Sequence, residues 1–154
     1  MRAALILAAM ITCGPARADW QYAHWGMTPE ETLAASHGQL RWCDAQCKRQ
    51  VSDDDIALLY GDYQSGEFKF TLFMFFGKET KSLSYVRLRL TEPKKSDQLV
   101  EVFRKQYSEP KKQENTEVMK TFTWNADFNW ITIRQIGYGA PPDLTTVTYL
   151  LQLR

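Results

Sequence analysis

The residues best suited to chemistry are a cysteine pair, two histidines and a run of acids. Cys43 and Cys47 are separated by three residues in the stretch RWCDAQCKRQ. On a helical turn, this spacing would place their Cα atoms about 6 Å apart, within the range that a disulfide spans. The closed loop is short, so a bridge would fix the local loop shape more than the global stability. We interpret the pair as a structural disulfide, with free or regulatory thiols and a metal site as the alternatives.

Other cysteine chemistry fits the spacing less well. Haem attachment requires Cys-x-x-Cys-His, and a thioredoxin-type site requires Cys-x-x-Cys at the start of a helix. Neither pattern is present. A zinc site requires about four ligands, and only His24 and His37 are available to join the two cysteines. We therefore expect neither a metal nor a cofactor.

The sequence also lacks a recognisable catalytic arrangement. His24 and His37 flank the two ends of one predicted helix, so we do not expect them to meet in one site. The consecutive acids Asp53, Asp54 and Asp55 point in different directions and lack the spacing of an EF-hand loop, which favours a solvated loop. No Gly-x-Ser-x-Gly or His-Glu-x-x-His motif occurs. We therefore expect a protein that is not an enzyme.

Aromatic side chains and arginines are the remaining candidates for function. The chain contains 8 Phe, 7 Tyr and 5 Trp residues. Protein interfaces favour aromatic side chains and arginine, so an uncovered sheet face bearing both would suit a protein partner. The candidate partner-binding residues are Phe73, Phe75, Tyr85, Arg87, Arg89, Trp124 and Trp130. The alternative is that these rings complete a small core or lie beneath the N-terminal arm.

The first 18 residues have the pattern of a secretory signal peptide. Arg2 precedes an apolar run over residues 3–12, and Ala16-Arg17-Ala18 supplies the small residues of a cleavage site. This predicts cleavage between Ala18 and Asp19. An apolar run of about ten residues is too short to span a bilayer, which requires roughly 20. We expect export to the periplasm of a Gram-negative bacterium, without stable membrane insertion.

Two further features of the sequence bear on where the protein is located and on which kinds of partner it binds. Lipidation at Cys13 is disfavoured, because Thr12 and Met10 stand where a lipoprotein signal has a small residue and often Leu. Removal of residues 1–18 leaves 17 basic against 18 acidic side chains, a net charge of −1. Nucleic-acid binding proteins usually carry a strong basic excess, so we expect no nucleic-acid partner.

The stretch WGMTPEETLAASHG predicts a short helix with well-defined ends. Thr28 and Glu31 have the spacing of a capping box, and Pro29 stands at the first helical position. Gly38 is placed to end the helix. A second helix follows Pro93: Ser96 is placed to cap it, and Leu99, Val102, Phe103 and Tyr107 form an apolar stripe, with Val100 at its edge.

Alternating or continuous apolar patterns predict six strands. Their ranges are 56–63, 67–76, 82–90, 118–124, 128–136 and 145–153. The connections are short, which implies antiparallel pairing. We expect one α+β domain over residues 19–154, built as an antiparallel sheet of about six strands with two helices packed on one face. The order of elements suggests two α-β-β-β units.

The helix start resembles a group of small bacterial envelope proteins. Their pattern is Gly-x-[Ser/Thr]-x-[Glu/Asp]-[Glu/Gln], and Gly26, Thr28, Glu30 and Glu31 match it. The second helix ends with the sequence KQYSEP. This ending is similar to the Tyr-Gly-x-Pro ending of such units, with Ser108 where Gly is usual. The chain thus resembles the β-lactamase-inhibitor-like and outer-membrane-assembly-lipoprotein-like folds.

The resemblance implies a non-catalytic binding module of the cell envelope. On this reading the protein is an inhibitor, an adaptor or an accessory of envelope assembly. The alternative is a periplasmic binder of a small ligand or lipid, using a cavity between the helices and the sheet. A hydrolase is the least favoured reading.

Overall fold

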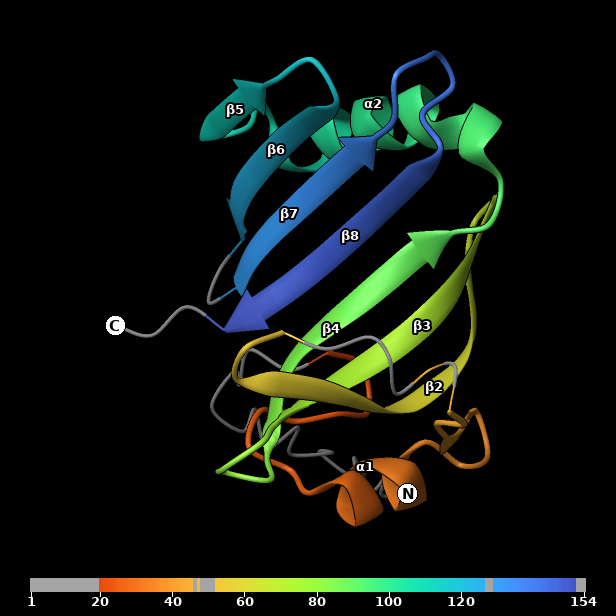
Figure 1. Cartoon of the computed structure of the whole chain (residues 1–154), viewed down its shortest axis with the longest axis vertical. Coiled ribbons are helices and arrows are strands. Elements are labelled where there is room, and N and C mark those ends of the chain that lie inside the picture. Colours follow the sequence, from red (N-terminus) through yellow and green to blue (C-terminus); the bar gives the residue numbers. More distant parts are fainter. Residues whose placement is uncertain (1–19, 46, 48–51, 127–128, 152–154) are drawn as a thin grey trace, which may run out of the picture.

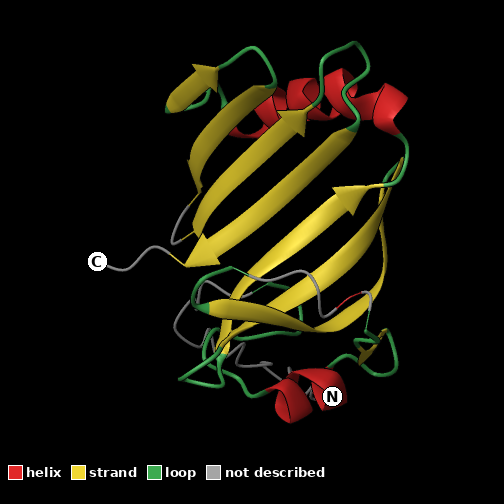
Figure 2. Cartoon of the chain, viewed as in Figure 1, coloured by secondary structure: helices red, strands yellow, loops and turns green. Residues whose placement is uncertain are grey.

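The computed structural model describes residues 20–45, 47, 52–126 and 129–151. Within them the fold is α+β, with two helices and one antiparallel sheet (Figure 1). The helices are α1 (Pro29–Ala35) and α2 (Ser96–Tyr107), and the 3-10 turn η2 (Pro93–Lys95) leads into α2. The strands are β1 (Leu40–Trp42), β2 (Asp55–Ser65), β3 (Phe68–Gly77), β4 (Leu83–Leu90), β5 (Lys112–Asn115), β6 (Met119–Ala126), β7 (Asn129–Ile136) and β8 (Leu144–Leu151). The two helices lie at opposite ends of the sheet (Figure 2).

The sheet order is symmetric about its centre. The strands are arranged β1-β2-β3-β4-β8-β7-β6-β5, so each half is one helix followed by four strands along the chain. The halves meet where β4 pairs antiparallel with β8, and Arg87 stands opposite Thr148 in the middle of this pairing. Residues paired across neighbouring strands form a row through the sheet. The row through Arg87 and Thr148 continues to Phe73 of β3 on one side and to Thr132 of β7 on the other.

The sheet has eight strands, not about six as predicted. The six expected strands are present, and the two additional ones are the edge strands β1 and β5. β1 has three residues, of which only Leu40 is buried, and all four residues of β5 are exposed. Edge strands that are this short and polar carry no alternation that sequence reasoning would detect.

Helix α1 begins with the capping box that the sequence predicts. The Glu31 amide donates to the Thr28 hydroxyl at 3.2 Å, and the Thr28 amide donates to Glu31 Oε2 at 2.9 Å. The helix ends at Ala35, and both His37 and Gly38 then have positive φ, at 49° and 85°. The left-handed reversal thus begins one residue before the glycine.

Helix α2 differs from the prediction in two details. Ser96 does not cap the helix but lies inside it, 1% exposed, with its hydroxyl 2.6 Å from the Thr145 hydroxyl. The buried stripe includes Val100, whereas Val102 is 37% exposed. The apolar face is therefore rotated slightly from the predicted one.

The main core lies between the sheet and the two helices. Leu99 and Phe103 from α2 and Leu33 from α1 pack on the same cluster, which includes Leu72, Met74, Val86, Leu88, Ile131, Ile133 and Val147 from the sheet. We call the side of the sheet that faces this cluster the core face, and the opposite side the outer face. Trp25, just before the capped helix, also bridges the halves: its indole N–H donates to Asn129 Oδ1 of β7 at 3.2 Å.

Candidate functional site

The two histidines flank helix α1, and the acidic run lies at the start of β2. Among the described residues, no group of three or more histidine, cysteine or carboxylate side chains is arranged to hold a metal ion. Asp53 and Asp54 lie in the turn before β2, and Asp55 is the first residue of that strand; Lys78 Nζ donates to the carbonyls of Ser52 and Asp53, both at 2.8 Å. The acidic run therefore takes part in a loop held by backbone contacts.

The cysteine pair lies on the outer face of the first half of the sheet. Cys43 and Cys47 are within disulfide distance, with Cα atoms 5.1 Å apart. They are buried in a second apolar cluster together with Phe73, Phe75 and Tyr85. The start of the connection between β1 and β2 thus folds back over the outer face and covers its aromatic rings.

Of the two readings of the candidate aromatic residues, completion of a small core is the one that describes Phe73, Phe75 and Tyr85. Phe73 is 5% exposed, Phe75 is fully buried and Tyr85 is 7% exposed. The rings of Phe75 and Tyr85 stack at 4.3 Å between centroids. Burial raises the pKa of Tyr85, and the positive charge of Arg87 opposes that shift. These rings form a satellite core.

Arginines form the outer layer above these rings. The Arg87 guanidinium lies 4.9 Å from the Phe75 centroid and 5.3 Å from that of Tyr85. The Arg89 guanidinium lies 5.0 Å from the Phe73 centroid. At these distances, cation–π attraction holds the planar groups over the rings. Arg87 and Arg89 are half-buried, so both keep part of their surface toward solvent.

Trp124 does not belong to this surface, although it was predicted to be part of it. It lies on the core face, 1% exposed, with its ring centroid 5.7 Å from that of Phe103. Its indole N–H donates to the Ser108 carbonyl at 2.9 Å, just after the end of α2. The alternation of β6 contained the signal, because Trp124 shares a face with buried Phe122.

Threonines line the outer face of the second half, where Thr121 and Thr146 are buried and the others are half-buried. In Figure 1, α2 lies behind the strands, and this face of β6, β7 and β8 is turned toward the viewer. The row through Arg87 continues across Thr148, Thr132 and Thr123. The neighbouring row runs from Arg89 through Thr146 and Arg134 to Thr121. Sequence reasoning missed Arg134 and these threonines, although the alternating runs TFTW, ITIR and TTVT contained the signal.

In the described part of the chain, none of the three arginines of this surface belongs to an ion pair. By contrast, each edge of the sheet has a local ion pair, Asp62 with Arg41 at 3.8 Å and Glu114 with Lys112 at 2.9 Å. The middle of the outer face therefore carries positive charge that no ion pair among these residues neutralises.

Two apolar side chains lie beside the arginines on the outer face of the sheet. Trp130 is half-buried, Leu150 is 44% exposed, and the two pair across β7 and β8 in the row that leads to Tyr85. We call the surface of Arg87, Arg89, Arg134, Trp130, Leu150 and the intervening threonines the arginine–threonine face. Guanidinium groups beside an indole and an aliphatic side chain are the composition that protein interfaces favour.

Comparisons with known proteins assign no family to this chain. No family model matches the sequence, and no curated protein or solved structure is significantly similar to it. None of the described helices is long and apolar enough to cross a membrane.

Proposed function

We propose that this protein is a non-catalytic interaction module of the cell envelope, and that its arginine–threonine face binds an acidic surface of a partner protein. The observation that carries the proposal is the group of three arginines that belong to no ion pair among the described residues, beside exposed Leu150. An acidic partner would supply the missing counter-charges, and Trp130 and Leu150 would supply apolar contact.

Export to the periplasm forms part of this proposal. A cysteine pair at disulfide distance is typical of proteins that fold in an oxidising compartment. The N-terminal pattern that predicts a signal peptide lies outside the described residues. An inhibitor, an adaptor and an assembly accessory would all use such a face.

The experiment that tests the proposal is affinity capture from periplasmic extract with a charge-reversed bait. Arg134→Glu is the informative variant, because Arg134 is exposed and none of the ion pairs or ring contacts in the described part of the chain involves it. Lys120→Glu is the matched control, since it makes the same charge change on the opposite face of the neighbouring strand β6.

We expect the wild type and Lys120→Glu to capture the same acidic protein and Arg134→Glu to lose it. A reversed charge against an acidic surface should weaken binding by at least about tenfold, and added salt should weaken the wild-type complex. Equal capture of one partner by all three baits would contradict the proposed face.

A further inference from the structure

Helix α2 leaves a cavity on the core face, away from the proposed interface. The helix packs closely over the second half of the sheet, where Phe103 contacts Trp124 and Ser96 contacts Thr145. Toward the hairpin of β2 and β3, a cavity of about 250 Å³ remains between helix and sheet. It is open to solvent beside Val102, which is 37% exposed.

The walls of this cavity are apolar and aromatic. Phe68, Phe70 and Leu88 line it from the sheet, and Leu99 and Phe103 line it from α2. Each of these side chains is at most 8% exposed. This apolar part of the wall can bury the apolar body of a small ligand.

Tyrosine hydroxyls, together with Ser65 and Gln106, provide the polar groups of the cavity. Tyr63, Tyr107 and Tyr149 line it together, and the Tyr107 hydroxyl accepts from Gln106 Nε2 at 3.0 Å. Burial, together with the neighbouring Tyr107 and Tyr63, raises the pKa of Tyr149, which therefore keeps its proton. Among the described residues, the hydroxyls of Tyr63 and Tyr149 form no hydrogen bond with the chain, so both are available to a ligand. None of the described residues that line the cavity is charged.

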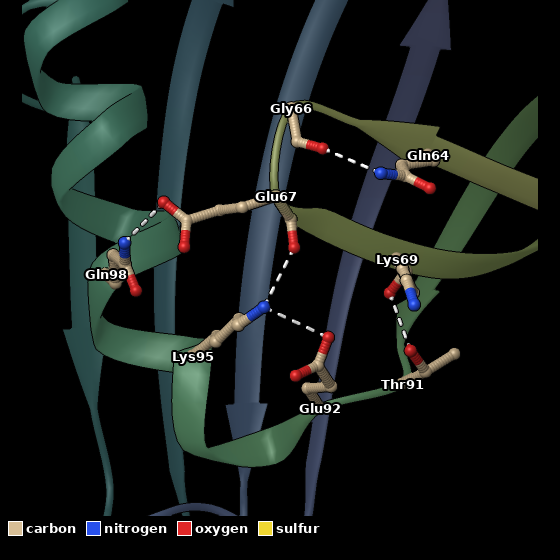
Figure 3. Close-up of polar contacts among 8 residues, drawn as sticks. All are labelled: Gln64, Gly66, Glu67, Lys69, Thr91, Glu92, Lys95 and Gln98. Carbon is tan, nitrogen blue, oxygen red and sulfur yellow. Dashed lines mark hydrogen bonds and ion pairs between the residues drawn. The ribbon is translucent and has the colours of Figure 1, made fainter.

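Polar contacts hold the two sides of the cavity at a fixed separation. Figure 3 shows Lys95, at the entry to α2, donating to the Glu67 carbonyl at 2.9 Å and pairing with Glu92 at 3.1 Å. Gln98 Nε2 on α2 donates to Glu67 Oε1 at 2.7 Å, and the Thr91 hydroxyl donates to the Lys69 carbonyl at 3.0 Å. These contacts tie the β2–β3 hairpin to the start of α2 beside the cavity.

We propose that this cavity binds a small uncharged molecule with an apolar body and one hydrogen-bonding head group. The body lies against Phe70, Leu88 and Leu99, and the head contacts the hydroxyls of Tyr149 and Tyr63. At the roughly 30 Å³ that a water molecule occupies, the volume suits on the order of ten non-hydrogen atoms. A carboxylate-bearing analogue binds more weakly, because no lining cation compensates the burial of its charge.

The test is calorimetric titration of 1-octanol into the protein, with NMR shifts to locate the site. We expect a dissociation constant of about 10–100 μM for the wild type. Octanoate should bind at least about tenfold more weakly. Val102→Trp places an indole at the opening and should weaken octanol binding at least about tenfold. Lys105→Trp adds the same ring at an exposed α2 position outside the cavity lining and should leave binding unchanged.

A second variant tests the head group separately. Tyr149→Phe should weaken octanol binding about fivefold and leave the binding of toluene, which has no head group, unchanged. Absence of saturable octanol binding to the wild type would overturn the proposal. So would equal octanol affinity in a folded Val102→Trp protein. If that variant does not fold, wild-type NMR shifts confined to residues other than Leu99, Phe103 and their neighbours would refute the site.

Discussion

The contribution of Arg87 to packing over the buried rings can be measured with one substitution. Its guanidinium lies over both Phe75 and Tyr85, at 4.9 Å and 5.3 Å from their centroids. Each contact at a half-buried site contributes about 0.5–1 kcal/mol, and the aliphatic stem covers further ring surface. We expect Arg87→Ala to lower the free energy of unfolding by about 1–2 kcal/mol. In a chain of this length, that corresponds to a fall in Tm of about 3–8 °C.

Urea unfolding followed by tryptophan fluorescence measures this change. Arg134→Ala is the control: Arg134 is exposed and lies over no ring, so the free energy of unfolding should change by less than about 0.5 kcal/mol. Arg87→Lys keeps the charge but loses the planar stacking, and should fall between the wild type and Arg87→Ala. If the Ala variants of Arg87 and Arg134 were equally stable, packing of Arg87 over the rings would not contribute to the free energy of unfolding.

A variant that keeps the stem has a spectroscopic consequence. Burial raises the pKa of Tyr85, and the charge of Arg87 opposes this effect. Arg87→Met removes the charge but still covers the rings, so it should raise that pKa further, as measured by ultraviolet titration of the phenol with Tyr85→Phe as the reference. A lower Tyr85 pKa in Arg87→Met would contradict the position of the guanidinium beside this ring.

Three further predictions concern the scaffold. Gln135→Ala removes a buried amide that donates to Ser96 Oγ at 2.7 Å and to Asp97 Oδ1 at 2.9 Å, and should cost about 1–3 kcal/mol in urea unfolding; a neutral effect would contradict that role. Thr28→Ala breaks the capping box and should cost about 1 kcal/mol in the same assay, against a few tenths for Glu30→Ala, which leaves the box intact. Burial raises the pKa of Tyr22 to about 12 from about 10. Because the folded state holds this proton more tightly, the resulting stability is present below about pH 10 and lost as the pH rises through about 12. Tyr22→Phe should remove that part of the decline between pH 10 and 12, and an identical decline in both proteins would exclude Tyr22 as its source.

Much of the fold was predictable because most of its patterns are local. The α1 cap depends on Thr28 and Glu31, three residues apart, and the six longer strands carry their own apolar runs. Strand β5 could not be found this way, because all of its side chains are exposed and its place depends on pairing with β6. Ser96 appeared to be a cap because its contact with Thr145 joins residues 49 positions apart.

The candidate surface was predictable only in part. Arg87 and Arg89 were identified from the sequence. The burial of Phe75 was not predictable in the same way, because it depends on the chain around Cys43 folding across the ring, and no local pattern indicates such a contact. Arg134 could have been predicted from the sequence. In the run ITIR it alternates with the buried residues Ile131 and Ile133, which places it on the opposite face of the strand. The strand register then brings it beside Thr146 and, one strand further, Arg89.

The central pairing of β4 with β8 also specifies which edges may join. If two copies of β4 paired antiparallel about Arg87, this residue would stand directly opposite Arg87 of the second copy. Two like charges facing each other across neighbouring strands are destabilising, whereas the actual neighbour is the uncharged Thr148. The central arginine thus disfavours pairing of β4 with a second β4 about this residue, whereas the uncharged Thr148 of β8 is an acceptable neighbour.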